Sequence, residues 1–211
     1  MMEVSLKKNE QEMTFENVNN LTPIQEFYSG QNIFITGGTG FIGKLLIEKL
    51  LRACPGINCI YLLIRSKKGK NVLQRKEELV EDLLFSTLRE KEPTFHNRIV
   101  TIEGDCSLLN LGISMTDKTT LIQNVSIVFH VAATVRFNEK IKSATAINVR
   151  SLKDAINLSK EMPKLKITWN MAKHLYLHEI SCRKCGEKAC RFDTNWNISS
   201  RSCDINVSRT Y

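Results

Sequence analysis

Apolar residues along this chain fall mostly into short continuous runs, separated by longer stretches with helical periodicity. Continuous apolar runs are typical of strands that are buried on both faces of a parallel sheet. The pattern predicts strands at residues 32–36, 59–64, 98–103, 126–131 and 165–168. It predicts helices at residues 44–53, 72–90, 118–123 and 140–161. This alternation predicts an α/β fold, a doubly wound parallel sheet that is incomplete after its fifth strand.

A glycine-rich turn joins the first predicted strand to the first predicted helix. The segment ITGGTGFIGKLL spaces Gly37, Gly40 and Gly43 three residues apart. In a Rossmann-like fold the first such glycine allows a tight turn, the second lets the backbone approach a pyrophosphate, and the third lets the helix pack closely. Free N–H groups at the helix start then bind the phosphates. An ordinary loop is the alternative, but the strand before it and the amphipathic helix after it favour a dinucleotide-binding turn.

The second predicted strand ends in a cation where an acidic residue would favour NAD. Arg65 lies about twenty residues beyond the last glycine of the turn, with Lys67 and Lys68 close behind. A guanidinium pairs with a 2′-phosphate through two parallel, charge-assisted hydrogen bonds. The sequence therefore predicts NADPH over NADH. The alternative is that these cations belong only to a solvated loop.

Further candidates follow the third and fourth predicted strands. Asp105 is a candidate acceptor for the adenine amino group, and a turn or capping role is the equal alternative. Ala132 and Ala133 are small enough to let backbone pass beside a cofactor. His130 lies within an apolar strand. We therefore interpret it as a core histidine in preference to a catalytic one.

Charge and composition divide the chain unevenly. The net charge is +8, with 21 basic against 18 acidic residues in 1–163 and 9 against 4 in 164–211. We interpret this as a compositional break plus a few phosphate-binding cations, and we expect no nucleic-acid binding. No apolar run is long enough to span a membrane, and the polar start lacks a signal peptide. These features predict an intracellular, cytosolic protein, and the cysteines at 54, 59 and 106 suit a reducing compartment.

Three segments are expected from these patterns: a flexible leader at 1–22, a partial NADPH-binding domain at 23–168 and a divergent, basic, Cys-rich tail at 169–211. The tail offers a second interpretation, because His and Cys clusters can bind zinc. Its candidate ligands are His174, His178, Cys182, Cys185, Cys190 and Cys203. Only one tight Cys pair is present, so we favour an unstructured tail of different origin and predict no metal site.

Taken together, the sequence resembles the extended short-chain dehydrogenase/reductases and, within them, the fatty acyl-CoA reductases. The likeness covers about residues 22–163 and is carried by the segments IQEFYSGQNIFITGGTGFIGKLLIEKLLRACPGI, IYLLIRSKKG, IEGDCSLLNLGIS and VFHVAATVRFNEKIKSATAINVRS. The resemblance implies reduction of a long-chain acyl-CoA to a primary alcohol, with two NADPH consumed per substrate. It also implies a Tyr that protonates the substrate oxygen and a Lys that lowers the pKa of that Tyr, in a YxxxK motif.

The resemblance further implies which residues line NADPH. These are Gly37, Gly40, Phe41, Ile42, Gly43, Arg65, Asp105, Ala132, Ala133 and Thr134. Asn148 matches an Asn that helps to order the site. Family members are associated with peroxisomes or the endoplasmic reticulum, and membrane association is expected only through a C-terminal part absent here.

The likeness fails where the catalytic helix should follow. Four residues after Tyr176 stands Ile180 instead of lysine, and Tyr211 is the last residue. We therefore predict no catalytic residue and expect a truncated, inactive member of the reductases. A non-catalytic NADPH-binding or regulatory module and a zinc-dependent interaction tail are the alternatives.

Overall fold

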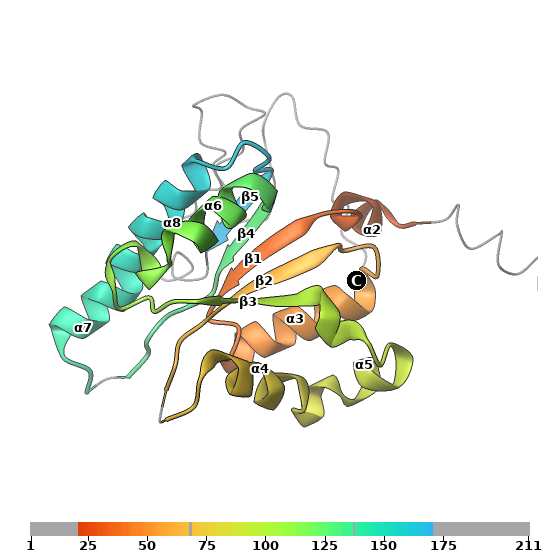
Figure 1. Ribbon diagram of the computed structural model, residues 1–211, viewed down its shortest axis with the longest axis horizontal. Coiled ribbons are helices and arrows are strands. Elements are labelled where there is room, and N and C mark those ends of the chain that lie inside the picture. The colour runs from red at the N-terminus through yellow and green to blue at the C-terminus, as the bar shows by residue number, and fades with distance from the viewer. Residues whose placement is uncertain (1–20, 68, 137, 171–211) are drawn as a thin grey trace, which may run out of the picture.

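The structure, a computed structural model, describes residues 21–67, 69–136 and 138–170 (Figure 1). Five strands form one sheet: β1 Asn32–Thr36, β2 Cys59–Ile64, β3 Ile99–Glu103, β4 Ile127–His130 and β5 Ile167–Asn170. Their order is β3-β2-β1-β4-β5 and every neighbouring pair is parallel. The doubly wound parallel sheet is therefore confirmed. The direction in which successive strands are added to the sheet switches between β1 and β4. In such sheets ligands bind at the carboxyl ends of the strands on either side of this switch point.

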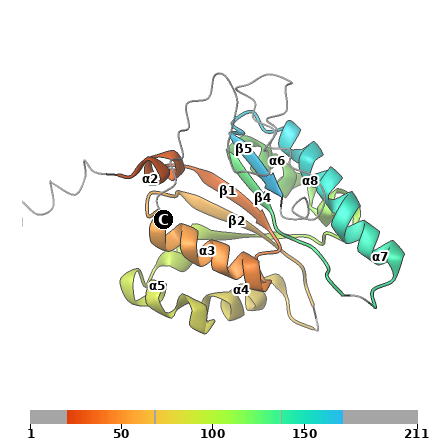
Figure 2. The same cartoon turned by 180° about the vertical axis from the view of Figure 1, so that it is seen from behind.

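Helices cover both faces of the sheet (Figures 1 and 2). One face carries α3 Phe41–Ala53, α4 Val72–Val80 and α5 Ser86–Lys91, and the other carries α6 Met115–Asn124, α7 Ile141–Thr145 and α8 Ser151–Lys160. Alternate residues of β1 serve the two layers: Ile33 and Ile35 pack with the α3 side, and Phe34 packs with the α8 side. Within the part of the chain that the structure describes, each helix is too short or too polar to cross a membrane.

The long helix predicted at 72–90 is interrupted, so that prediction was wrong. Helix α4 ends at Val80, a short 3-10 helix occupies Leu83–Phe85 (η1), and α5 follows. Asp82 has an extended ψ of 142°, and its carboxylate accepts a hydrogen bond from the Leu84 N–H at 3.0 Å. The same carboxylate pairs with Lys44 of α3. These local bonds compete with helical ones, and the bend lets Phe85 be fully buried.

Other elements begin or end away from their predicted positions. Helix α3 starts at Phe41, three residues earlier than expected, because Gly40 is its N-cap. Thr22, which was expected to lie in a leader, caps a further helix α2 at Pro23–Tyr28. Strand β5 begins at Ile167, two residues after the expected start at Leu165, and runs to Asn170. The helix predicted at 140–161 is divided by a π-helical turn at Ala146–Arg150 (η4) between α7 and α8.

Two shorter connections complete the fold. A 3-10 turn at Phe95–Arg98 (η2) leads into β3, and another at Leu109–Gly112 (η3) leads out toward α6. Phe95 of η2 stacks on Phe85 of η1 with ring centroids 5.7 Å apart. Both rings are buried in the core cluster that also includes Leu88 of α5. Offset aromatic pairs of this kind add to the stability that burial alone provides.

A buried chain of hydrogen bonds ties β1 and β4 to α8. His130 is fully buried, with Nδ1 2.8 Å from Thr36 Oγ1 and Nε2 3.1 Å from Ser151 Oγ. The Ser151 hydroxyl donates to the Ile147 carbonyl. Its oxygen must therefore accept from His130 Nε2–H, which leaves Nδ1 to accept from Thr36. The neutral Nε2–H ring satisfies every group, and the interpretation of His130 as a core histidine is confirmed.

This chain of bonds predicts a loss of stability in mild acid. Burial lowers the pKa of His130 to about 4. The unfolded chain binds a proton near pH 6.5 and the folded chain does not, so the free energy of unfolding falls as pH drops from about 6.5 toward 4. The His130 contribution to this fall is about 3 kcal/mol. Urea unfolding of wild type and His130→Asn across this range checks it, and equal pH slopes for the two proteins would contradict it.

Candidate cofactor-binding site

The glycine-rich turn after β1 is packed so closely that two of its glycines have no substitute. Gly37 has φ +76°, and a Cβ there would lie 2.5 Å from the backbone nitrogen of Ala132. A Cβ on Gly43 would lie 2.3 Å from the Gly37 carbonyl oxygen. Gly40 has more room, since its Cβ would be 3.2 Å from the same oxygen. The turn is therefore folded back against both the start of α3 and the loop after β4.

Sequence reasoning passed over a fourth glycine in this turn. A Cβ on Gly38 would lie 2.0 Å from Cδ1 of Leu62 and 3.0 Å from Cδ1 of Ile47. Gly38 therefore lets the turn rest directly on side chains of β2 and α3. The only signal in the sequence was its position next to Gly37, because spacing cannot reveal which side chains meet from distant segments.

The start of α3 is open toward a ligand. Its N-cap Gly40 has no side chain to accept a hydrogen bond from the first-turn N–H groups. Such groups, with the helix dipole, bind phosphate. Phe41 and Ile42 lie in this first turn with their side chains exposed, 76% and 41% respectively. The uncapped amides and the glycine cradle fit the pyrophosphate of a dinucleotide.

Arg65 and Asp105, which lie forty residues apart in sequence, meet at the carboxyl ends of β2 and β3. Arg65 Nη1 lies 3.3 Å from Asp105 Oδ2. Asp105 Oδ1 also accepts the Ser107 N–H at 2.7 Å. Burial alone would raise the pKa of the Asp105 carboxyl, but the bonds from Ser107 and Arg65 outweigh it and hold that pKa below its usual value. Asp105 is therefore a fixed, ionised acceptor beside an exposed guanidinium.

Arg75 of α4 is a second cation at this site, and sequence reasoning missed it. Its Nη1 donates to the Arg65 carbonyl at 2.6 Å, and its Nη2 lies 3.3 Å from Thr39 Oγ1 in the glycine-rich turn. The guanidinium thus bridges the tip of β2 and the turn. The sequence shows that Arg75 lies ten residues after Arg65, but it does not show that α4 packs beside the end of β2. Lys67, by contrast, forms a backbone bridge with Lys70 in the loop between β2 and α4.

Ala132, Ala133 and Thr134 form the loop that leaves β4, and Asn148 fixes it. The Asn148 side chain accepts from the Thr134 N–H at 2.8 Å and donates to the Thr134 carbonyl at 3.0 Å. Asn148 lies within the π-helical turn η4. Such turns are frequent at functional sites. The structure therefore brings the loop, Asn148 and the glycine-rich turn together at one edge of the sheet.

Among the described residues, neither the tyrosines nor Cys106 has a pKa suited to acid–base chemistry near neutral pH. The tyrosines among the described residues, Tyr28 and Tyr61, have pKa values raised by burial, whereas a proton-donating tyrosine needs a lowered one. Burial likewise raises the pKa of the Cys106 thiol to about 12. Residues 21–67, 69–136 and 138–170 hold no metal-binding group of three or more His, Cys, Asp or Glu. The zinc ligands proposed for the tail lie outside the described residues.

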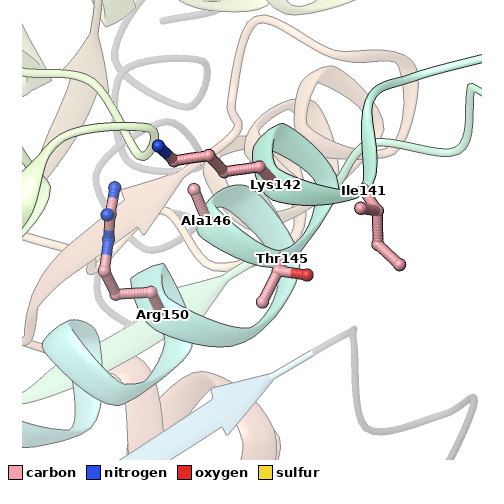
Figure 3. Close-up of a pocket in the computed structure, with 5 residues that line it drawn as sticks. All are labelled: Ile141, Lys142, Thr145, Ala146 and Arg150. Carbon is pink, nitrogen blue, oxygen red and sulfur yellow. The ribbon is translucent and has the colours of Figure 1, made fainter.

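An open pocket of about 340 Å³ lies against α7 and η4. Figure 3 shows Lys142 and Arg150 extending to the same side of this helix, past Ala146. Ile141 and Thr145 complete the lining. The Arg150 guanidinium also donates to the Ser107 carbonyl, in the loop that carries Asp105. The pocket therefore borders the loop that carries Asp105.

Comparison with known proteins agrees with this geometry. A sequence model of the NAD-binding family described as "Male sterility protein" matches residues 35–181. The chain belongs to this family. It therefore takes a nicotinamide dinucleotide, and the match begins within β1, immediately before the glycine-rich turn.

Curated relatives of this male sterility family member are fatty acyl-CoA reductases. The chain is 50% identical over 145 residues to "Fatty acyl-CoA reductase wat" of Drosophila melanogaster, and 41% identical over 147 residues to "Fatty acyl-CoA reductase 1" of Homo sapiens. These alignments cover 69% and 70% of this chain. The chain spans 28% of the length of each relative. The resemblance to fatty acyl-CoA reductases is confirmed for the part of those proteins that it matches.

Solved structures show the same fold. The terminal R domain of the myxalamid PKS-NRPS biosynthetic pathway matches with a TM-score of 0.55 and 27% identity, covering 67% of this chain and 34% of that one. The reductase (R) domain of a nonribosomal peptide synthetase from Mycobacterium tuberculosis matches with a TM-score of 0.52 at 24% identity, covering 66% and 32%. At this identity the second match concerns the fold alone.

Two substitutions in the turn test which glycine is needed for packing and which for binding the dinucleotide. Gly43→Ala forces a Cβ against backbone and should lower stability by about 1–3 kcal/mol. Gly40→Ala meets a single neighbouring atom, so its melting temperature should stay near that of wild type while dinucleotide affinity falls. Thermal melts and NADPH titrations of both variants check this. A Gly40→Ala protein that binds like wild type would show that the phosphates do not approach Gly40.

Proposed function

We propose that this chain binds NADPH, with the 2′-phosphate held between Arg65 and Arg75. The observation that carries the proposal is the bridge formed by Arg75, which contacts the Arg65 carbonyl at 2.6 Å and Thr39 of the glycine-rich turn. Two guanidinium groups at the tip of β2 suit a dianionic phosphate. Arg65 and Ser66 follow β2, where an acid would select the ribose hydroxyls of NAD.

The rest of the dinucleotide has a proposed place along the same edge. The pyrophosphate lies on the amides of Gly40, Phe41, Ile42 and Gly43, and Asp105 accepts a hydrogen bond from the adenine amino group. Ala132, Ala133 and Thr134 line the nicotinamide end, in a conformation that Asn148 holds. Support comes from the uncapped start of α3, the fixed carboxylate of Asp105 and the two bonds from Asn148 to Thr134.

The reaction that we propose for the whole protein is the reduction of a long-chain acyl-CoA to a primary alcohol. When held by the residues named above, NADPH would supply the hydride for both reductions, from thioester to aldehyde with release of CoA and from aldehyde to alcohol, one NADPH for each. Support comes from the reductase relatives at 50% and 41% identity. This chain's residues bind and orient the cofactor for that reaction. The peroxisome or endoplasmic reticulum location belongs to the same proposal.

A second candidate, a non-catalytic NADPH-binding or regulatory module, has one observation in its favour. The tyrosines among the described residues, Tyr28 and Tyr61, have pKa values raised by burial, which does not suit a proton donor. A module of this kind would bind NADPH without transferring hydride. The two candidates share the cofactor site and differ only in whether the bound cofactor gives up its hydride.

A chimera tests whether the cofactor site of this chain can serve hydride transfer. Residues 21–170 replace the matching segment of "Fatty acyl-CoA reductase wat", and the product is supplied with palmitoyl-CoA and NADPH. We expect formation of the alcohol, because the grafted segment supplies a working cofactor site. The same chimera with Gly43→Ala is the inactive control. A folded chimera that binds NADPH but oxidises none of it would support the non-catalytic module.

Cofactor selectivity tests the role of the two arginines. Arg75→Ala and Arg65→Ala should each weaken NADPH binding about tenfold, the effect of losing a charge-assisted hydrogen bond, and should change NADH binding little. Isothermal titration calorimetry with both cofactors measures this. Arg52→Ala, which removes an arginine paired with Glu48 on α3, is the matched control. An NADPH preference that survives in both site variants would contradict the assignment.

A further inference from the structure

Two charged residues of the η4–α8 helix hold the loop that follows β3. Asp154 Oδ2 accepts the Asn110 N–H at 3.0 Å, and the Arg150 guanidinium donates to the Ser107 carbonyl. Residues four apart lie on the same face of a helix, so both side chains reach the same loop. Both bonds are made to backbone groups. They therefore control the path of the loop whatever its side chains are.

The loop has an unusual backbone that needs such support. Asn110, Leu111 and Gly112 are consecutive residues with left-handed φ values of 52°, 60° and 61°. Only glycine adopts this region freely. Leu111 is nevertheless buried, at 1% exposure, in the core cluster beside α8. The left-handed turn thus persists because the surrounding contacts outweigh its local preference.

Each helix residue acts within two peptide groups of a hydrogen bond to Asp105. The Ser107 carbonyl is held by Arg150, and the Ser107 N–H donates to the Asp105 carboxylate at 2.7 Å. The Asn110 N–H is held by Asp154, and the Leu111 carbonyl, two peptide groups further along, accepts the Asp105 N–H at 2.8 Å. Side chain and backbone of Asp105 are therefore both fixed through residues that the helix holds.

The space around Asp105 allows little adjustment. A Cβ on Gly104 would lie 2.5 Å from the Leu111 carbonyl oxygen and 2.7 Å from Leu63 Cδ1. The loop thus lies directly on the backbone at the end of β3. A displacement of Leu111 would move the backbone of Asp105 with it.

We propose that Arg150 and Asp154 are positioning residues for the adenine end of the cofactor site. They act through Ser107, Asn110 and Leu111 to hold the Asp105 carboxylate where it accepts the adenine amino group. This inference rests on the proposed function, because it requires NADPH to bind with its adenine beside Asp105. It assigns to the helix a part in base recognition in addition to its packing against the sheet.

The test compares NADPH with its hypoxanthine analogue, in which a carbonyl replaces the adenine amino group. Wild type should prefer NADPH, because only adenine donates to Asp105. Asp154→Ala and Arg150→Met should weaken NADPH binding about tenfold and leave the analogue nearly unchanged, so that the preference is lost. Asp154→Asn keeps an acceptor oxygen and should retain the preference. Lys153→Ala, at an exposed position in the same turn, is the control.

A double-mutant cycle shows whether the effect passes through Asp105. In an Asp105→Asn background, Asp154→Ala should cause no further loss of NADPH affinity. Equal loss of both dinucleotides, or unchanged affinity for both, in variants that melt like wild type would overturn the inference and leave the proposed function standing. If Asp154→Ala does not fold, Arg150→Met gives the same comparison. Wild type that binds neither dinucleotide would overturn the proposed function and this inference together.

Discussion

The site depends on one close approach, between the turn after β1 and the loop after β4. These two strands are neighbours in the sheet, and their connections leave toward opposite faces. The backbones nevertheless pass so near each other that a single Cβ at Gly37 would overlap the backbone of Ala132. Because Gly37 has no Cβ, these two backbone segments can lie in contact. The first-turn amides of α3 face outward at the same edge of the sheet. The site therefore requires both the strand order, which makes β1 and β4 neighbours, and the glycine, which lets the segments that follow them come close together.

The helix after β4 gives this edge its second support. Its π-helical turn carries Asn148, which holds Thr134, and Arg150, which holds Ser107. Ser151 begins α8 and joins the helix to the sheet through His130 and Thr36. One helix thus contacts the loops that follow β3 and β4 and is itself fixed to β1 and β4. Networks of buried, satisfied polar groups of this kind define a unique arrangement.

Of the two cations near the tip of β2, one could be identified from the sequence and the other only from the tertiary structure. Arg65 was identifiable, because its place is set by the strand that precedes it and by its distance from the glycines. Arg75 was not, because it lies on a separate helix whose return to the strand tip depends on packing against β2 and β3. The bend at Asp82 was also hidden. A helical pattern of apolar residues continues through it, and the bonds to Leu84 and Lys44 that produce the bend involve local geometry and another helix.

By itself, the sequence determined the parallel α/β fold, the position of the glycine-rich turn and the glycines at 37 and 43, because periodicity and turn chemistry are local properties. It also indicated the basic strand tip and the core character of His130. Only the tertiary structure decided that Gly38 rests on Leu62, that Arg75 bridges to Thr39, and that a left-handed turn at Leu111 is held by Asp154. These features join segments that are far apart along the chain. Their energies come from contacts that exist only once the sheet has formed, and no periodicity records them.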